Sequence, residues 1–132
     1  MTRVMLVEDD QDLRLVLRDG LVARGHVVWA FGNGRDALSA WVDGLKERAE
    51  VALIDLHLPD MDGTRLAEKL RAVDRRVGIV FLTGDSVSRA QVLDLVLTKP
   101  VDFEEIGRAL VQLHVARWAH PEDSLGRFHE LI

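Results

Sequence analysis

The sequence contains no cysteine, only three prolines and no long apolar run, and its basic residues are not gathered in any tract. The lack of cysteine excludes disulfide bonds and thiolate metal sites. Binding to nucleic-acid phosphates needs clustered Lys and Arg, but the longest basic run is Arg75-Arg76, so we expect no direct binding of nucleic acid. A membrane span needs roughly 20 consecutive apolar residues, and the first apolar run, Val4–Val7, is also too short for a secretory signal. We therefore expect a cytoplasmic protein without membrane contact.

What the sequence does have is the composition of a folded domain. Its 132 residues fit one domain and suffice to bury a core. Hydrophobic residues make up 48% and charged residues 30%, which is typical of globular proteins, and the formal net charge is −5. We assign residues 1–118 to the domain and residues 119–132 to a C-terminal tail. Leu125, Phe128 and Ile132 approximate one helical face, so the tail would pack on the domain or bind a partner. The alternative is a frayed terminus.

Short apolar runs alternate with longer segments of helical spacing. The runs are Val4–Val7, Val27–Phe31, Val51–Ile54, Val77–Leu82 and Leu95–Leu97. Continuous apolarity is typical of strands buried on both faces, as in a parallel sheet. Between the runs, apolar residues recur on one helical face, as at Leu13, Leu17 and Leu21. The repeated β-α order predicts a flavodoxin-like α/β fold, with a doubly wound sheet of five parallel strands and helices on both faces.

Polar residues that could carry chemistry follow four of these runs within three positions. They are Glu8, Asp9 and Asp10 after the first run, Asp55 and His57 after the third, Thr83 after the fourth and Lys99 after the fifth. In a doubly wound sheet, ligands bind outside the carboxyl ends of the strands, so these residues should converge. Gathered carboxylates repel one another unless a cation lies among them, and Mg²⁺ prefers such oxygen ligands. The alternative for Glu8, Asp9 and Asp10 is that a helix N-terminus favours negative charge.

Asp55 is the candidate nucleophile. It ends the run VALID, although strands disfavour Asp. A carboxylate can attack phosphorus and form an acyl phosphate, and Mg²⁺ would neutralise both the carboxylate and the incoming phosphate. The hydroxyl of Thr83 can donate to a phosphoryl oxygen, and the ammonium of Lys99 can pair with the carboxylate or with the phosphate.

These motifs resemble those of the response-regulator receiver family of two-component signalling. MLVEDD is similar to its first strand and acidic cluster, ALIDLHLPDMDG to its phosphorylation motif, VFLTG to its hydroxyl-bearing strand and LTKP to its lysine turn. The similarity covers residues 3 to 118. It implies that Asp55 accepts a phosphoryl group from a sensor histidine kinase or a phosphotransfer protein. It also implies that Asp9, Asp55 and the backbone carbonyl of His57 bind Mg²⁺ directly, with Glu8 acting through water.

By the same resemblance, Thr83 and Lys99 read the phosphoryl group. The domain would then be a switch with weak self-dephosphorylation rather than an enzyme, acting by contact with a downstream protein. A second copy of the chain is a further candidate partner.

The chain departs from the family pattern at two points. Thr83 and Lys99 are 99 − 83 = 16 positions apart. That is about six residues fewer than in typical receivers, or roughly 1.7 helical turns. The missing residues fall in SVSRAQVLD, so we expect the family's fourth helix to be shortened or missing. Val96 occupies the position of the usual aromatic switch residue, so the usual hydroxyl-aromatic coupling and output surface are not expected.

Two other functions remain open from the residues. A pseudo-receiver that is never phosphorylated is suggested by the short fourth-helix segment. A metal-dependent phosphohydrolase with an Asp nucleophile usually needs a second Asp two residues later as general acid, and His57 occupies that position here. The side chain of His57 either tunes attack by water or is simply an exposed loop residue.

Overall fold

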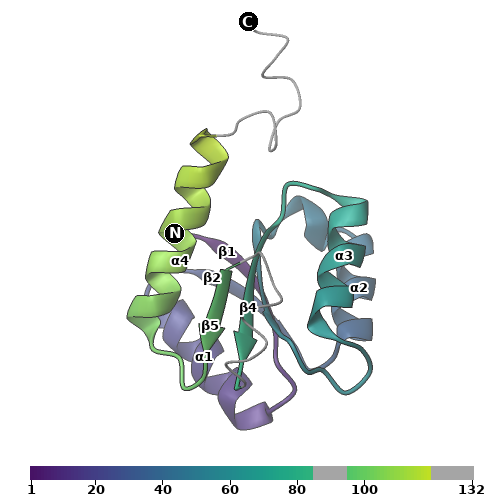
Figure 1. Cartoon of the computed structure of the whole chain (residues 1–132), viewed down its shortest axis with the longest axis horizontal. Coiled ribbons are helices and arrows are strands. Elements are labelled where there is room, and N and C mark those ends of the chain that lie inside the picture. Colours follow the sequence, from purple (N-terminus) through teal and green to yellow (C-terminus); the bar gives the residue numbers. More distant parts are fainter. Residues whose placement is uncertain (85–94, 120–132) are drawn as a thin grey trace, which may run out of the picture.

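A computed structural model of the chain describes residues 1–84 and 95–119, with side chains up to residue 114. The elements are β1 (Arg3–Val7), α1 (Gln11–Ala23), β2 (Val27–Phe31), α2 (Gly34–Val42), the 3₁₀ helix η1 (Leu45–Glu47), β3 (Val51–Asp55), α3 (Gly63–Val73), β4 (Gly78–Thr83), β5 (Leu95–Thr98) and α4 (Phe103–Ala119). The strands of the described part form one parallel sheet in the order β2-β1-β3-β4-β5 (Figure 1). The predicted flavodoxin-like α/β fold is confirmed.

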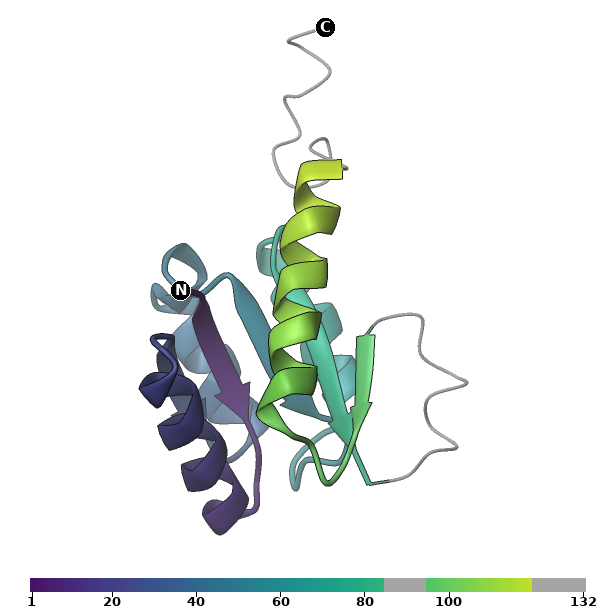
Figure 2. The same ribbon diagram turned by 90° about the vertical axis from the view of Figure 1, so that its left-hand side faces the viewer.

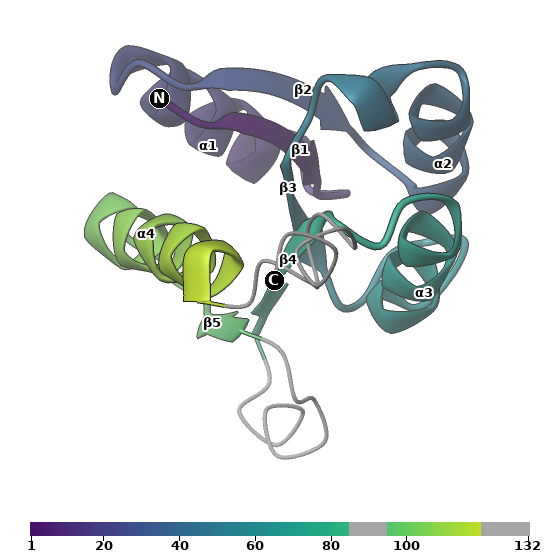
Figure 3. The ribbon, with the colours of Figure 1, turned by 90° about the horizontal axis from the view of Figure 1, so that it is seen from above.

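The sheet lies between two helical layers because successive strand residues point to opposite faces. Met5, Ile54 and Phe81 belong to a core that also contains Trp41 of α2 and Leu70 of α3. Their sequence neighbours in the same strands belong to a second core, which packs against α1 and α4; it includes Leu6, Leu53 and Leu82 from the strands and Leu17, Leu21, Ile106 and Leu110 from the helices. Figure 3 shows the sheet between these two pairs of helices. The continuous apolar runs are explained by this burial on both faces.

Side-chain caps fix where the helices begin. Asp10 accepts a hydrogen bond from the backbone N–H of Leu13 at the start of α1, at 3.1 Å. Asn33 does the same for Asp36 at the start of α2, at 2.8 Å. Asp102, the predicted cap of the last helix, accepts from the N–H of Glu105 at 2.7 Å. These caps satisfy N–H groups that have no partner within the helix, so β1, β2 and β5 each lead within a few residues into a helix, whereas a loop over residues 56–62 follows β3.

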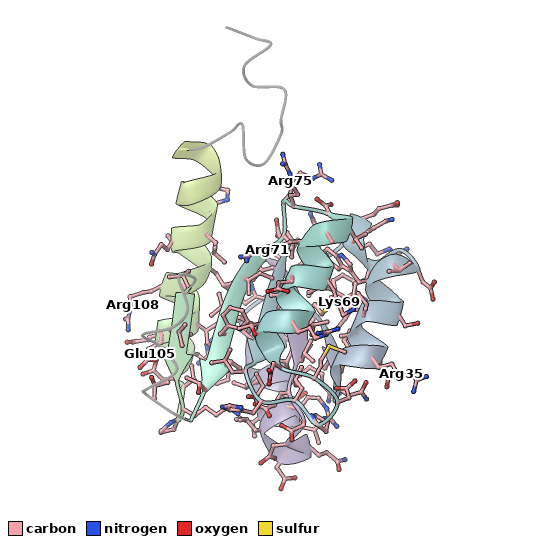
Figure 4. All side chains as sticks on the ribbon, turned by 45° about the vertical axis from the view of Figure 1, so that its right-hand side comes forward. Arg35, Lys69, Arg71, Arg75, Glu105 and Arg108 are labelled. Carbon is pink, nitrogen blue, oxygen red and sulfur yellow. The ribbon has the colours of Figure 1, made fainter. Side chains whose placement is uncertain are left out.

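The five described strands, β1 to β5, run in one direction, so their carboxyl ends lie along one edge of the sheet. Figure 2 shows the strand arrows pointing to this edge, with α1 and α4 on the near face. Within the described residues, no helix is both long and apolar enough to cross a membrane. The basic side chains labelled in Figure 4 are distributed over several elements: Arg35 on α2, Lys69 and Arg71 on α3, Arg75 in the turn before β4 and Arg108 on α4.

Some expectations concern residues that the structure does not describe. The segment expected to hold a shortened or missing fourth helix lies outside the described residues at 85–94. Apart from Ala119, which ends α4 as described, the expected tail over 119–132 also lies outside them. The boundary between residues 118 and 119 therefore stays a prediction.

Candidate functional site

The polar residues expected at the strand ends do lie at the carboxyl edge of the sheet. Glu8 and Asp9 follow β1, Asp55 is the last residue of β3, Thr83 is the last residue of β4, and Lys99 follows β5. β1 and β4 both pair with β3 in parallel, so the carboxyl ends of these three strands are adjacent. Lys99 is held at the end of β4 because its backbone N–H donates to the carbonyl of Thr83 at 2.7 Å.

Asp55 is buried at this edge, with 4% of its surface exposed. Its Oδ1 accepts a hydrogen bond from the backbone N–H of His57 at 2.9 Å. Its Oδ2 accepts one from Nζ of Lys99 at 2.8 Å. A strand can carry a buried carboxylate at its end when donors of this kind compensate the lost hydration. Both carboxylate oxygens are therefore oriented before any ligand arrives.

Glu8 is a fully buried carboxyl group beside Asp55. Its Oε2 accepts a hydrogen bond from the N–H of Asp10 at 3.1 Å. Burial raises the pKa of Glu8 from 4.5 to about 7, against the lowering effects of Lys99 and of the Asp10 N–H, and the Asp55 carboxylate raises it further. Two carboxylates this close in a buried site compete for one ammonium group.

Lys99 connects the two carboxylates. Its Nζ lies 2.7 Å from Oε1 of Glu8 and 2.8 Å from Oδ2 of Asp55. Burial on its own lowers the pKa of Lys99, but the interactions of its ammonium with the carboxylates of Asp55 and Glu8 outweigh this effect, so the pKa is raised. The ammonium is therefore charged at neutral pH and neutralises part of the acidic cluster.

Thr83 and His57 flank Asp55 in different ways. Thr83 is fully buried at the end of β4, which pairs with β3 on one side and β5 on the other. His57 is exposed in the loop between β3 and α3, and its backbone forms an isolated bridge with Asp62. The backbone carbonyl of His57, expected as a metal ligand, stays a prediction.

The acidic residues fit a bound divalent cation. One oxygen from each of Glu8, Asp9 and Asp55 lies within 4.8 Å of the other two, which makes the set a candidate metal site among the described residues. Oε1 of Glu8 is buried and has no hydrogen-bond partner in the part of the chain described, because the approach of Lys99 Nζ lacks hydrogen-bond geometry. A buried carboxylate oxygen that accepts no hydrogen bond from the described residues, beside two further carboxylates, gives a donor set suited to Mg²⁺.

Sequence reasoning missed three residues that shape this edge. The guanidinium of Arg14 donates to the backbone carbonyl of Glu8 at 2.8 Å. Both carboxylate oxygens of Asp60 accept backbone N–H groups of α2, from Gly34 at 2.9 Å and from Arg35 at 2.8 Å. Gly63 passes so close to the carbonyl oxygen of Asp55 that a Cβ there would overlap it. The glycine could have been found from the sequence as a close-approach position after the acceptor motif.

Comparison with known proteins gives this arrangement a family. The response regulator receiver domain profile matches residues 4–111. The chain is 34% identical over 112 residues to the transcriptional regulatory protein PcoR of Escherichia coli, covering 80% of this chain and 48% of PcoR. It is 31% identical over 122 residues to the response regulator receiver protein CpdR of Brucella abortus, covering 88% of this chain and 99% of CpdR. The chain thus spans about half the length of PcoR and nearly all of CpdR.

A solved structure shows the same fold. The response regulator protein TrrA of Thermotoga maritima in complex with Mg²⁺-BeF matches with a TM-score of 0.76 at 24% identity, covering 86% of this chain and 99% of that chain. TrrA has also been solved in complex with the histidine kinase ThkA, where it matches with a TM-score of 0.71, again at 24% identity, covering 86% of this chain and 98% of that chain. With a profile match over most of its length and a relative of nearly equal span above 30% identity, the chain belongs to the response regulator receiver family of two-component signalling.

Proposed function

We propose that this receiver accepts a phosphoryl group on Asp55 from a phosphohistidine of a sensor histidine kinase or a phosphotransfer protein, in a reaction that requires Mg²⁺. The observation that carries the proposal is the buried carboxylate of Asp55, which ends a central strand next to Glu8 and within 2.8 Å of Lys99. A nucleophile needs this kind of fixed orientation toward its target.

The reaction transfers the phosphoryl group from an imidazole nitrogen of the donor to a carboxylate oxygen of Asp55. A carboxylate oxygen of Asp55 forms a bond to phosphorus, the phosphorus–nitrogen bond of the donor imidazole breaks, and the imidazole nitrogen takes the electron pair. Asp9, Asp55 and the carbonyl of His57 would hold the Mg²⁺, with Glu8 acting through water, and the ion would supply positive charge to the transferring phosphoryl group. The N–H of His57 and the ammonium of Lys99 fix the carboxylate of Asp55 in place.

Lys99 and Thr83 would bind the phosphoryl group once it is attached to Asp55. Phosphorylation of Asp55 replaces one carboxylate charge by a dianionic group, to which an ammonium and a hydroxyl both form strong hydrogen bonds. Thr83 is buried at the end of β4, next to the strand that carries Asp55. Val96 lies opposite Phe81 in the β4–β5 pair and is 9% exposed, so an aliphatic residue stands where the family usually has its aromatic switch. The output would therefore be a protein contact that does not depend on a moving ring.

The proposed Mg²⁺ and kinase draw further support from a protein of the same fold. TrrA binds Mg²⁺-BeF and forms a complex with the histidine kinase ThkA. For the present chain, we also propose a location in the cytoplasm. Its proposed partners are a downstream protein and a second copy of the chain. A pull-down with and without a phosphoryl mimic would identify the downstream partner.

The test is phosphorylation of the purified chain by acetyl phosphate with Mg²⁺, followed by intact mass. We expect a lasting gain of one phosphoryl group, which is lost in Asp55→Asn and in the presence of EDTA. Asp43→Asn, which removes an exposed carboxylate at the end of α2, is the matched control and should be modified normally. An unmodified mass together with no binding of Mg²⁺ would favour the pseudo-receiver, and rapid turnover of acetyl phosphate would favour a phosphohydrolase.

A further inference from the structure

Arg14 is a cation beside the acidic cluster that is bonded to backbone instead of carboxylates. It lies in the second turn of α1 and is half-buried. Its Nη1 donates to the backbone carbonyl of Glu8 at 2.8 Å and lies 3.5 Å from the carbonyl of Asp9. Within residues 1–84 and 95–114, Arg14 forms no ion pair. Arg14 therefore does not occupy the carboxylates of Glu8 and Asp9, and the ammonium that pairs with Glu8 is that of Lys99.

Gly32, in the connection between β2 and α2, leaves room for the guanidinium of Arg14 because it has no side chain. A Cβ at Gly32 would lie 2.8 Å from Nη1 of Arg14. The same peptide segment is held from its other side, because the N–H of Glu8 donates to the carbonyl of Phe31 at 3.0 Å. Both the N–H and the C=O of Glu8 are thus fixed, and this fixes the direction in which the side chains of Glu8 and Asp9 leave the backbone.

We infer that Arg14 is a positioning residue for the divalent-cation site, and the inference rests on the proposed function. Groups that orient metal ligands without touching the metal typically change metal affinity when they are removed. The charge and the geometry of Arg14 act in opposite directions. A cation near the site repels Mg²⁺, so removal of the charge alone would strengthen binding. Loss of the carbonyl contacts would release the Glu8–Asp9 segment and weaken binding.

The experiment compares Mg²⁺ affinity by calorimetric titration in four variants of the full chain, one of which is the conservative change Arg14→Lys. Arg14→Met removes both the charge and the donors. Gly32→Ala keeps the charge but displaces the guanidinium, and it is tolerable because the obstructing atom is the end of a flexible side chain. Arg18→Met is the matched control, because it removes a charge one turn further along α1, from an exposed arginine that contacts Asp19. Thermal unfolding with EDTA measures each variant's stability without metal.

The expected result is a loss of Mg²⁺ affinity on the order of tenfold for Arg14→Met, and a smaller loss for Gly32→Ala. Arg18→Met should bind as the parent does or slightly more tightly. Arg14→Lys, which keeps the charge and one kind of donor, should recover part of the affinity. A merely structural role would lower the unfolding temperature and leave the affinity unchanged.

Arg14→Met that binds Mg²⁺ as tightly as the parent, or more tightly, overturns the inference. If Arg14→Met does not give a folded protein, Gly32→Ala decides the matter: weaker binding supports the inference and unchanged binding overturns it. A parent chain that binds no Mg²⁺ contradicts the proposed function itself, and that outcome is distinguishable because it appears before any variant is compared.

Discussion

The ammonium group of Lys99 lies 2.8 Å from Oδ2 of Asp55, although 44 positions separate the two residues. The contact joins β3 to the turn after β5 across the end of β4, and the same Nζ lies 2.7 Å from Oε1 of Glu8. The nucleophile and its acidic neighbour are thus held by one side chain. This side chain has to rearrange if a phosphoryl group is placed on Asp55, because its two present partners are the carboxylates themselves.

Lys99→Ala separates acceptance of the phosphoryl group from the response to it. We expect phosphorylation of Asp55 by acetyl phosphate to persist in part, because the acidic cluster and Asp55 remain. The conformational response should be lost, because no ammonium is left to pair with the new charge. Amide NMR spectra with and without a phosphoryl mimic measure this response. Lys69→Ala, on α3, is the control. Equal spectral changes in Lys99→Ala and in the parent would show that Lys99 has no such role.

Glu8 should make the metal-free protein less stable as the pH rises toward neutrality. Its pKa is raised by burial to about 7, from an ordinary value of 4.5. The folded state therefore keeps a proton that the unfolded chain releases, so this contribution to stability is full below about pH 4.5 and is lost as the pH rises through about 7. Glu8→Gln, which stays neutral, should remove this decline.

Urea unfolding in EDTA between pH 4.5 and pH 8 provides the measurement for Glu8. Glu47→Gln changes an exposed carboxylate and serves as control. The relevant quantity is the difference in the free energy of unfolding between variant and parent at each pH. A difference that does not change with pH would mean that Glu8 titrates alike in both states.

The effect of His26 on stability should have the opposite dependence on pH, because stability is lost as the pH falls. Its Nδ1 accepts a hydrogen bond from the backbone N–H of Thr2 at 3.0 Å, which requires that this nitrogen carry no proton. Burial and, to a lesser extent, the N-terminal ammonium lower the pKa of His26 from 6.5. The stability that this group contributes is therefore present above about pH 6.5 and is lost as the pH falls through the lowered value.

In His26→Asn the amide oxygen can accept the same hydrogen bond at any pH. The variant should therefore match the parent at pH 8 and lose less stability on acidification to pH 5, as measured by urea unfolding. Parallel acid profiles for the two proteins would contradict the role of His26. The prediction is independent of the acidic cluster, because His26 precedes β2 at the opposite edge of the sheet from Asp55.

The positions of Glu8, Asp9, Asp55, Thr83 and Lys99 could be predicted because each follows an apolar run, and the runs alone set the order of strands and helices. An apolar run indicates a strand that is buried on both faces. The end of the run therefore indicates the end of the strand, which lies at the carboxyl edge of a parallel sheet. The convergence of these five residues needed only the further rule that parallel strands end at one edge.

The residues that sequence reasoning missed act through backbone groups. Arg14 donates to the backbone carbonyl of Glu8. Because every residue has a backbone carbonyl, the sequence does not indicate which one is the partner. Asp60 caps α2 from 26 positions away, while Asn33, the cap adjacent to the helix, already explains where α2 begins. Contacts of this kind depend on how two loops meet in space, which neither periodicity nor spacing specifies.

The close approach at Gly63 yields a prediction with opposite outcomes at two glycines. Gly63→Ala places a Cβ against the carbonyl oxygen of Asp55 and the Cα of Leu56, so either α3 or the end of β3 must move. We expect a loss of about 1–3 kcal/mol in the free energy of unfolding, as for other overpacked buried sites. Phosphorylation of Asp55 should also slow, because the displaced backbone carries the nucleophile.

Gly107→Ala is the matched control for Gly63→Ala. Gly107 lies inside α4, and a Cβ there meets nothing within 4 Å. Alanine should stabilise this helix by about 0.5–1 kcal/mol, because glycine loses more backbone freedom on folding. Urea unfolding gives both values, and intact mass after acetyl phosphate gives the rate at Asp55. If Gly63→Ala were as stable and as reactive as the parent, the contact with Asp55 would not constrain the acceptor strand. The absence of a side chain at position 63 would then be incidental to the site.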